Sequence, residues 1–164
     1  MIILEDTRQK PRQNAHITKQ LERLGCRVVR TKLFCGDYTF PTDQSVCVDT
    51  KQDLQEVVGN VTKQHERFAN ECKRAKAAGI KLVILVQDPK ITELSGVFGW
   101  YNPRLRFSKV ATTGRTLAKI MYTMRDKYGV QWEFATKDKI GERVIELLEE
   151  RKMVHHDQIQ SQPS

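Results

Sequence analysis

The stretch Val46-Cys47-Val48-Asp49-Thr50-Lys51 joins an apolar run to two charged side chains. Its first three residues are typical of a strand buried inside a sheet. Alternate side chains of a strand point to the same face, so Asp49 and Lys51 should stand side by side. A carboxylate beside an ammonium group at the end of a buried strand makes this stretch the first candidate for a functional site.

The spacing of an acid two residues before a lysine is not specific by itself. It recurs at Glu71-Cys72-Lys73, Asp88-Pro89-Lys90 and Glu150-Arg151-Lys152. The first and last of these fall on expected helices, where residues two apart diverge, and in the other a proline removes a backbone donor. Only residues 46–51 continue an apolar strand and follow a Gly36-Asp37 turn.

The pattern of apolar residues predicts alternating strands and helices. We expect strands at residues 2–6, 26–33, 38–40, 46–50, 81–86 and 130–135. We expect helices at residues 15–24, capped by Asn14, and at 53–58, 62–78, 117–128 and 138–148. Residues 88–112 lack a sustained period and are predicted to form a long loop. This order favours an α/β fold in which helices cover a mixed sheet.

The bulk composition fits one domain, which we place at residues 1–152, followed by a polar tail at 153–164. Of the 164 residues 39% are hydrophobic and 29% charged, which argues against wholesale disorder and against a membrane protein. No signal-peptide pattern opens the chain, so we expect an intracellular protein of the cytoplasm or nucleoid. The four cysteines form no CxxC pair, and free buried thiols are favoured over a zinc site or disulfides.

The formal net charge of +8 favours an anionic partner, and much of it lies in one segment. Residues 100–127 hold seven basic residues and one acid. DNA phosphates are the natural target of such a stripe. We therefore expect DNA contacts from Arg104, Arg106, Lys109 and Arg115, and from Arg8 near the N-terminus. A merely solvated basic face is the alternative. Trp100, Tyr101 and Phe107 would stack on bases or anchor the loop.

Several stretches in one order carry a family resemblance. They are Ile2-Ile3-Leu4-Glu5-Asp6-Thr7-Arg8, Leu24-Gly25-Cys26, Leu33-Phe34-Cys35-Gly36-Asp37-Tyr38 and Val46-Cys47-Val48-Asp49-Thr50-Lys51. Together they resemble the XPF-type nuclease domain of the PD-(D/E)XK superfamily, with its Asp-x-Arg-Glu stretch, Gly-Asp-Tyr turn and Val-Glu-Arg-Lys strand. The likeness continues through a helix bearing Arg67 and Glu71 and the next strand to about residue 148. Residues 88–112 lie outside it.

The resemblance implies a restriction-endonuclease-like core and a metal-dependent DNA endonuclease, with selectivity for flaps, forks or junctions as the family's usual property. It implies that Asp6, Asp37 and Asp49 bind Mg²⁺ or Mn²⁺ and that Lys51 positions or activates the attacking water. Glu5, Arg67 and Glu71 are candidates for a supporting layer around these groups.

Family members that cut branched DNA usually also carry a helix-hairpin-helix module, for which the stretch after Lys152 is too short. The resemblance therefore implies a stand-alone form of bacterial or phage type, or one whose DNA targeting comes from a homodimer or a partner protein.

Two departures from the family pattern bear on chemistry. Gln9 stands where the family has Glu, so one acid of the wider cluster is missing unless Glu5 replaces it. Asp49-Thr50-Lys51 replaces Glu-Arg-Lys, which shortens one metal ligand and removes an arginine.

Plainer interpretations exist for each residue. Gly36-Asp37 would be only a turn, Asp6 a strand-end cap and Lys51 a surface lysine, while Arg67 and Glu71 would pair on their helix and His65 would pack on an apolar face. A catalytically weak DNA-binding or scaffold subunit is therefore the rival hypothesis. A restriction-type or RNA-processing nuclease is a third. The retained acids and Lys51 favour catalysis.

Overall fold

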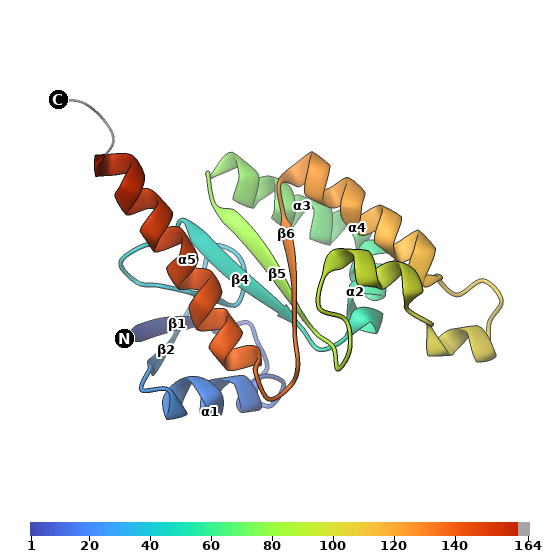
Figure 1. Cartoon of the computed structure of the whole chain (residues 1–164), viewed down its shortest axis with the longest axis horizontal. Helices are drawn as coiled ribbons and strands as arrows, with labels where there is room; N and C mark the ends of the chain where they lie inside the picture. The colour runs from blue at the N-terminus through green and yellow to red at the C-terminus, as the bar shows by residue number, and fades with distance from the viewer. Residues whose placement is uncertain (161–164) are drawn as a thin grey trace.

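A six-stranded mixed sheet forms the centre of the computed structural model, which describes residues 1–160 (Figure 1). The strand order is β2-β1-β3-β4-β5-β6. The strands are β1 (Ile2–Asp6), β2 (Arg27–Thr31), β3 (Tyr38–Thr39), β4 (Val46–Lys51), β5 (Lys81–Gln87) and β6 (Gln131–Ala135). The α-helices are α1 (Ala15–Arg23), α2 (Leu54–Val61), α3 (His65–Ala77), α4 (Gly114–Tyr128) and α5 (Ile140–Gln160). Two 3₁₀ helices, η1 (Leu94–Gly99) and η2 (Pro103–Arg106), precede α4.

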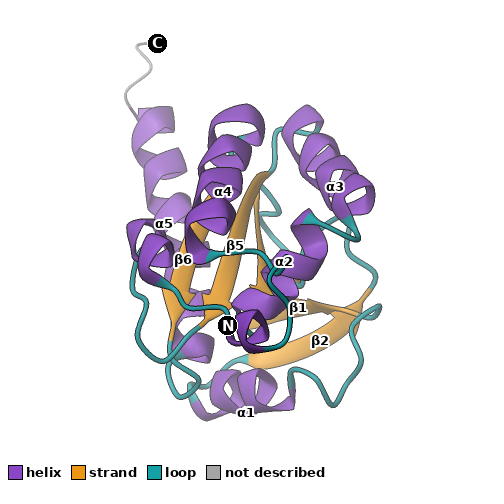
Figure 2. Ribbon diagram, turned by 90° about the vertical axis from the view of Figure 1, so that its right-hand side faces the viewer, coloured by secondary structure: helices purple, strands orange, loops and turns teal. Residues whose placement is uncertain are grey.

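Helices cover both faces of the sheet (Figure 2). Successive side chains of a strand point to opposite faces, so each buried strand supplies two apolar layers. On β4, Val48 packs into the layer under α1 and α5, and Cys47 packs into the layer under α2, α3 and α4. The predicted mixed sheet flanked by helices is confirmed.

The pairing pattern brings three segments to one edge of the sheet. β3 is antiparallel to both β1 and β4, which makes β1 and β4 parallel to each other. The carboxyl ends of β1 and β4 and the start of β3 therefore lie at the same edge. Asp6 ends β1, Asp37 immediately precedes β3, and Lys51 ends β4.

The structure departs from the sequence-based expectation in three places. Residues 88–112 are not one irregular loop, because η1 and η2 lie within them and Val97 is buried in the core. α5 continues to Gln160 instead of giving way to a polar tail after Lys152. The rest of that predicted tail, 161–164, lies outside the described residues. His65 lies on the same face of α3 as Phe68 and Cys72, as the spacing predicts, but it is exposed and not packed, because it is the first residue of the helix.

All four cysteines are free and buried, as the sequence predicts. Each lies in or beside a strand or a helix: Cys26 before β2, Cys35 before β3, Cys47 in β4 and Cys72 in α3. Within residues 1–160, no helix has the length and apolar character needed to cross a bilayer.

Two helical glycines give a matched test of the packing. Gly141 of α5 lies against α1, and a Cβ there would stand 2.6 Å from the Cβ of Gln20. Gly59 of α2 has no heavy atom within 4 Å of the same position. Gly141→Ala should lower the free energy of unfolding by about 1–3 kcal/mol, because overpacking outweighs the gain in helix propensity. Gly59→Ala should raise it by about 0.5–1 kcal/mol. Urea unfolding measures both, and shifts of the same sign would contradict the described α1–α5 contact.

Candidate active site

The three predicted aspartates meet at the sheet edge through backbone hydrogen bonds. The amide of Asp6 donates to the carbonyl of Asp37 at 2.8 Å, and the amide of Asp37 donates to the carbonyl of Val48 at 2.8 Å. Gly36, with φ of +69°, makes the preceding turn, and a Cβ there would lie 3.0 Å from the Cβ of Cys47. The turn therefore requires glycine, and it sets Asp37 between β1 and β4.

Thr50 holds the side chain of Asp37. Its backbone amide and its hydroxyl donate to Oδ2 of Asp37 at 2.7 and 2.8 Å. The amide group of Asn14 in turn donates to the Thr50 hydroxyl at 3.1 Å. Both bonds to Asp37 use Oδ2, and among the described residues no hydrogen bond engages Oδ1. Thr50, which stands where the resembled family has arginine, thus fixes the carboxylate next to it.

Lys51 forms a buried ion pair with Asp49. Its Nζ lies 2.8 Å from Oδ2 of Asp49, and the two side chains are 10% and 9% exposed. Among the described residues this ammonium group is the one partner of that oxygen. The Nζ also lies 5.2 Å from the centre of the Phe68 ring. Burial alone would lower the pKa of Lys51, but the charges of Asp49 and Asp37 outweigh it and raise the pKa, so the lysine is charged.

The neighbouring carboxylates crowd one another. The pKa of Asp37 is raised well above its ordinary value, by burial first and then by the charge of Asp49. The pKa of Glu71 is raised by the same two causes. Burial also raises the pKa of Glu56. The charge of Lys51, and for Glu71 also that of Arg74, counters these pKa shifts only in part. A cation bound beside Asp37 and Asp49 would relieve the remaining repulsion.

Oxygen donors in this arrangement suit a hard divalent cation, although they do not form a complete cage. Among the residues that the structure describes, no three His, Cys, Asp or Glu side chains lie close enough together to hold a metal ion. Mg²⁺ commonly takes only one or two protein carboxylates and completes its shell with water and substrate phosphate. Asp37 and Asp49 meet that requirement.

Asp6 reaches the same place but its carboxylate is already engaged. Oδ1 accepts the Leu33 amide at 2.9 Å, and Oδ2 accepts Nε of Arg8 at 2.7 Å. The guanidinium of Arg8 also donates to the Leu33 carbonyl at 2.8 Å. The role of Asp6 as a metal ligand stays a prediction, and it would require at least one of these bonds to open.

A pocket of about 560 Å³ surrounds this cluster. Seven of the predicted residues line it: Asp6, Arg8, Asp37, Asp49, Lys51, Arg67 and Glu71. Glu71 accepts a hydrogen bond from the Gly36 amide at 3.3 Å, which ties α3 to the turn. The helix spacing of Arg67 and Glu71 therefore places both on the pocket wall, and among the described residues they form no ion pair with each other.

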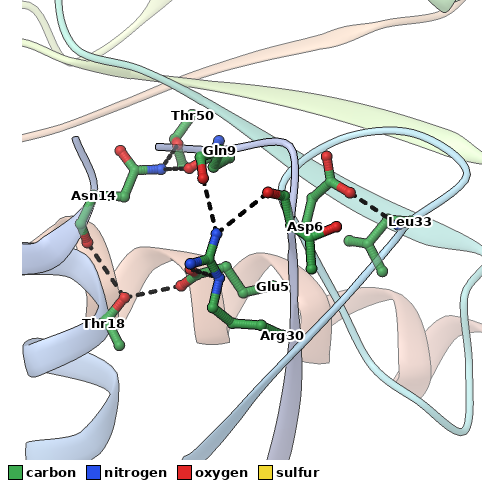
Figure 3. Close-up of polar contacts among 9 residues, drawn as sticks. Glu5, Asp6, Gln9, Asn14, Thr18, Arg30, Leu33 and Thr50 are labelled. Atoms are coloured by element: carbon green, nitrogen blue, oxygen red, sulfur yellow. Dashed lines mark hydrogen bonds and ion pairs between the residues drawn. The ribbon is translucent and has the colours of Figure 1, made fainter. Parts of the chain in front are cut away.

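Glu5 does not belong to the cluster. Figure 3 shows its carboxylate turned to Thr18 of α1 and Arg30 of β2, at 2.8 and 3.3 Å. It is next to Asp6 on β1 and therefore points to the other face of the sheet. The suggestion that Glu5 replaces the missing acid at Gln9 is wrong for this geometry.

The basic residues of the later segment stand apart from the pocket. The exposed set of Arg104, Arg106, Lys109 and Arg115 contributes nothing to its wall. Their segment contacts α2, a helix of the pocket wall: the side chain of Gln55 on α2 donates a hydrogen bond to the side chain of Asn102, just before η2. α2 also carries Glu56 and Asn60, which line the pocket.

Sequence reasoning missed several residues of the pocket wall. The sequence predicts that Asn14 caps α1, yet its side chain makes no cap bond and instead contacts Thr50 and Gln9. Nothing in the sequence signals that choice. Arg74 was accessible to sequence reasoning, because it lies three residues after Glu71 and seven after Arg67, on the same face of α3.

Comparisons with known proteins agree with this architecture. The family model of the ERCC4 domain matches residues 6–132, well over half of the chain. Among curated proteins, no sequence matches the chain significantly. Two similar solved structures are XPF from Aeropyrum pernix, alone and in complex with DNA.

Both solved structures share the fold of this chain at low sequence identity. For XPF alone the TM-score is 0.65 at 17% identity, over 92% of this chain and 61% of that one. For the complex with DNA it is 0.65 at 18% identity, over 93% and 65%. This chain thus spans less than two thirds of the length of either. The match over residues 6–132 is decisive: the chain belongs to the ERCC4 domain family and has the fold of the XPF-type nuclease domain.

Proposed function

We propose that the chain is a divalent-metal-dependent endonuclease that hydrolyses DNA phosphodiester bonds in the pocket at the sheet edge. The observation that carries the proposal is the pair of buried carboxylates, Asp37 and Asp49, with the charged Lys51 2.8 Å from Asp49. Membership of the ERCC4 domain family supports a nuclease. DNA is supported by the similar XPF structure that is solved in complex with DNA.

Each side chain has a distinct part in this chemistry. Asp37 and Asp49 would hold Mg²⁺ or Mn²⁺, which supplies Lewis acidity and a nucleophilic water for phosphodiester hydrolysis. Thr50 fixes the orientation of Asp37 through its two hydrogen bonds. Lys51 brings a positive charge against the reacting phosphate, where it offsets developing negative charge and orients the attacking water. Its burial against Phe68 limits solvent screening of that charge.

A basic groove leads out of the pocket and provides a path for the DNA backbone. It has a volume of about 1020 Å³ and shares Arg8, Gln64, Arg67, Glu71 and Arg74 with the pocket. Lys63 and Lys73 also line it, so its cations outnumber its two glutamates. We place the strand that carries the scissile phosphate along α3 in this groove. Cutting at flaps, forks or junctions, in DNA repair or recombination, is the finer form of the same proposal.

The metal site is tested most cleanly at Asp37. Asp37→Asn keeps an oxygen that accepts both bonds from Thr50, whereas Asp49→Asn would leave the buried Lys51 without its ion-pair partner. Asp37→Asn should lower the cleavage rate by about 100-fold or more, the effect of losing several kcal/mol of transition-state stabilisation. Gel assays with labelled DNA and Mg²⁺ or Mn²⁺ measure the rate.

Glu5→Gln is the matched control, because Glu5 neighbours Asp6 but faces the other side of the sheet. It should cleave as the parent protein does, and both variants should keep the parent's DNA affinity in chelator. Equal cleavage by Asp37→Asn and the parent would refute the metal site. DNA binding without cleavage in the parent itself would favour the scaffold subunit.

The DNA path is tested by the salt dependence of binding. Removing Arg67 and Arg74 together by alanine should weaken binding and reduce the slope of log affinity against log salt by roughly 0.9 per lost phosphate contact. Replacing Arg104 and Arg106 tests the second basic segment in the same way. Lys19→Ala with Arg23→Ala on the exposed side of α1 is the control for net charge. If the α3 pair changes no more than this control, the DNA does not follow the groove.

A further inference from the structure

Residues 100–113, which we call the arm, project from the body of the protein between η1 and α4. In Figure 1 the arm is the short helix η2 with its following loop, at the far right of the molecule. The match to the ERCC4 domain spans it, but none of the acidic and basic residues assigned to the cleavage site belongs to it. The pocket does not include it, so the proposed cleavage chemistry leaves its side chains unexplained.

The arm is fastened at its base. Asn102 is 1% exposed, and its amide group donates to the Thr112 carbonyl at 2.8 Å, which closes the arm on itself. Its side-chain oxygen accepts the Arg104 amide at 3.0 Å. At Gly114 a Cβ would lie 2.2 Å from the Trp100 carbonyl oxygen, so the two ends of the arm approach as only glycine allows. Trp100 packs against the core and anchors the arm.

The tip of the arm presents apolar side chains to solvent. Phe107 is 92% exposed and Val110 93%, although the backbone of Phe107 is held by a bond from its amide to the Arg104 carbonyl at 3.0 Å. Tyr101 is also 58% exposed, so three large apolar side chains of this short, fastened segment are open to a partner. Exposed cations precede and follow Phe107 in the sequence at Arg104, Arg106 and Lys109, and none of them forms an ion pair among the described residues.

Charge and ring together indicate what the tip binds. No acid occurs between Trp100 and Arg125, so the charge of the arm suits a polyanionic partner. An exposed ring between cations matches single-stranded nucleic acid, whose bases stack on aromatic faces while the backbone pairs with the cations. Paired bases inside a duplex offer no such face. The link from Asn102 to Gln55 sets the arm beside α2, which lines the pocket.

We propose that Phe107 stacks on an unpaired DNA base while Arg104, Arg106 and Lys109 contact phosphates of the same strand. The arm then favours substrates in which a single-stranded segment adjoins the cleavage site. This inference rests on the proposed function for its choice of DNA as the partner. It assigns the recognition of unpaired bases to Phe107.

The test uses Phe107→Ala, Phe107→Leu and Phe107→Trp in chelator, where no cleavage occurs. Fluorescence anisotropy measures affinity for an oligo-dT strand, a blunt duplex and a duplex with a single-stranded tail. The alanine and leucine variants should bind the first and third DNA roughly 5- to 150-fold more weakly, with blunt-duplex affinity unchanged. Phe107→Trp should bind like the parent. Because leucine keeps the apolar volume and loses the aromatic face, it separates stacking from hydrophobic contact.

A second readout follows the base directly. The parent and Phe107→Trp should quench 2-aminopurine in the single-stranded tail, and Phe107→Ala should not. Leu24→Ala, at a side chain 53% exposed at the end of α1, is the control for loss of a surface apolar group.

Three results would overturn the proposal: unchanged affinities in Phe107→Ala, an equal loss on blunt duplex, or a changed sedimentation coefficient with unchanged DNA affinity. The last would make the tip an interface between copies. These binding results do not depend on cleavage, so a protein that binds tailed DNA through Phe107 but never cuts it would contradict the proposed function alone.

Discussion

The site depends on two hydrogen bonds of the Asp37 backbone. This backbone accepts a bond from Asp6 and donates one to Val48, and so it spans two parallel strands that do not pair with each other. This bridge exists because the short β3 is antiparallel to both neighbours. The glycine at position 36 makes the bridge sterically possible. Residues 6, 37 and 49 meet at one edge for this reason, although 31 and 12 residues separate them along the chain.

The electrostatics follow from that convergence. Buried carboxylates at one point repel each other, and the raised pKa of Asp37 expresses the cost. The structure offsets part of it with Lys51 from β4, Arg8 after β1 and the two donors of Thr50. The remaining negative charge is the feature that a divalent cation would neutralise. The basic side chains of the adjoining groove along α3 outnumber its two glutamates, so a phosphate backbone can approach the pocket from that side.

The sequence predicts the fold well where apolar periodicity is strong. Strands 2–6 and 46–50 agree with β1 and β4 to within one residue, and the alternation of β4 correctly puts Asp49 beside Lys51. Alternation along β1 also puts Glu5 and Asp6 on opposite faces of the sheet. The same rule therefore argues against Glu5 as a replacement for the acid that is missing at Gln9. The sequence does not predict that the Asp6 carboxylate is already hydrogen-bonded, because the Leu33 amide that donates to it lies 27 residues away in the chain. The arm has no period, and its shape depends on the single buried side chain of Asn102.

The metal-dependent nuclease activity is tested most directly by cleavage with the unaltered protein. It is incubated with labelled single-stranded, duplex, flap and junction DNA in Mg²⁺, in Mn²⁺ and in chelator, and the products are separated by denaturing electrophoresis. Endonucleolytic products are expected with either metal, on at least one of these DNAs, and none in chelator. Intact DNA in every metal-containing reaction, or equal cleavage in chelator, would contradict this activity.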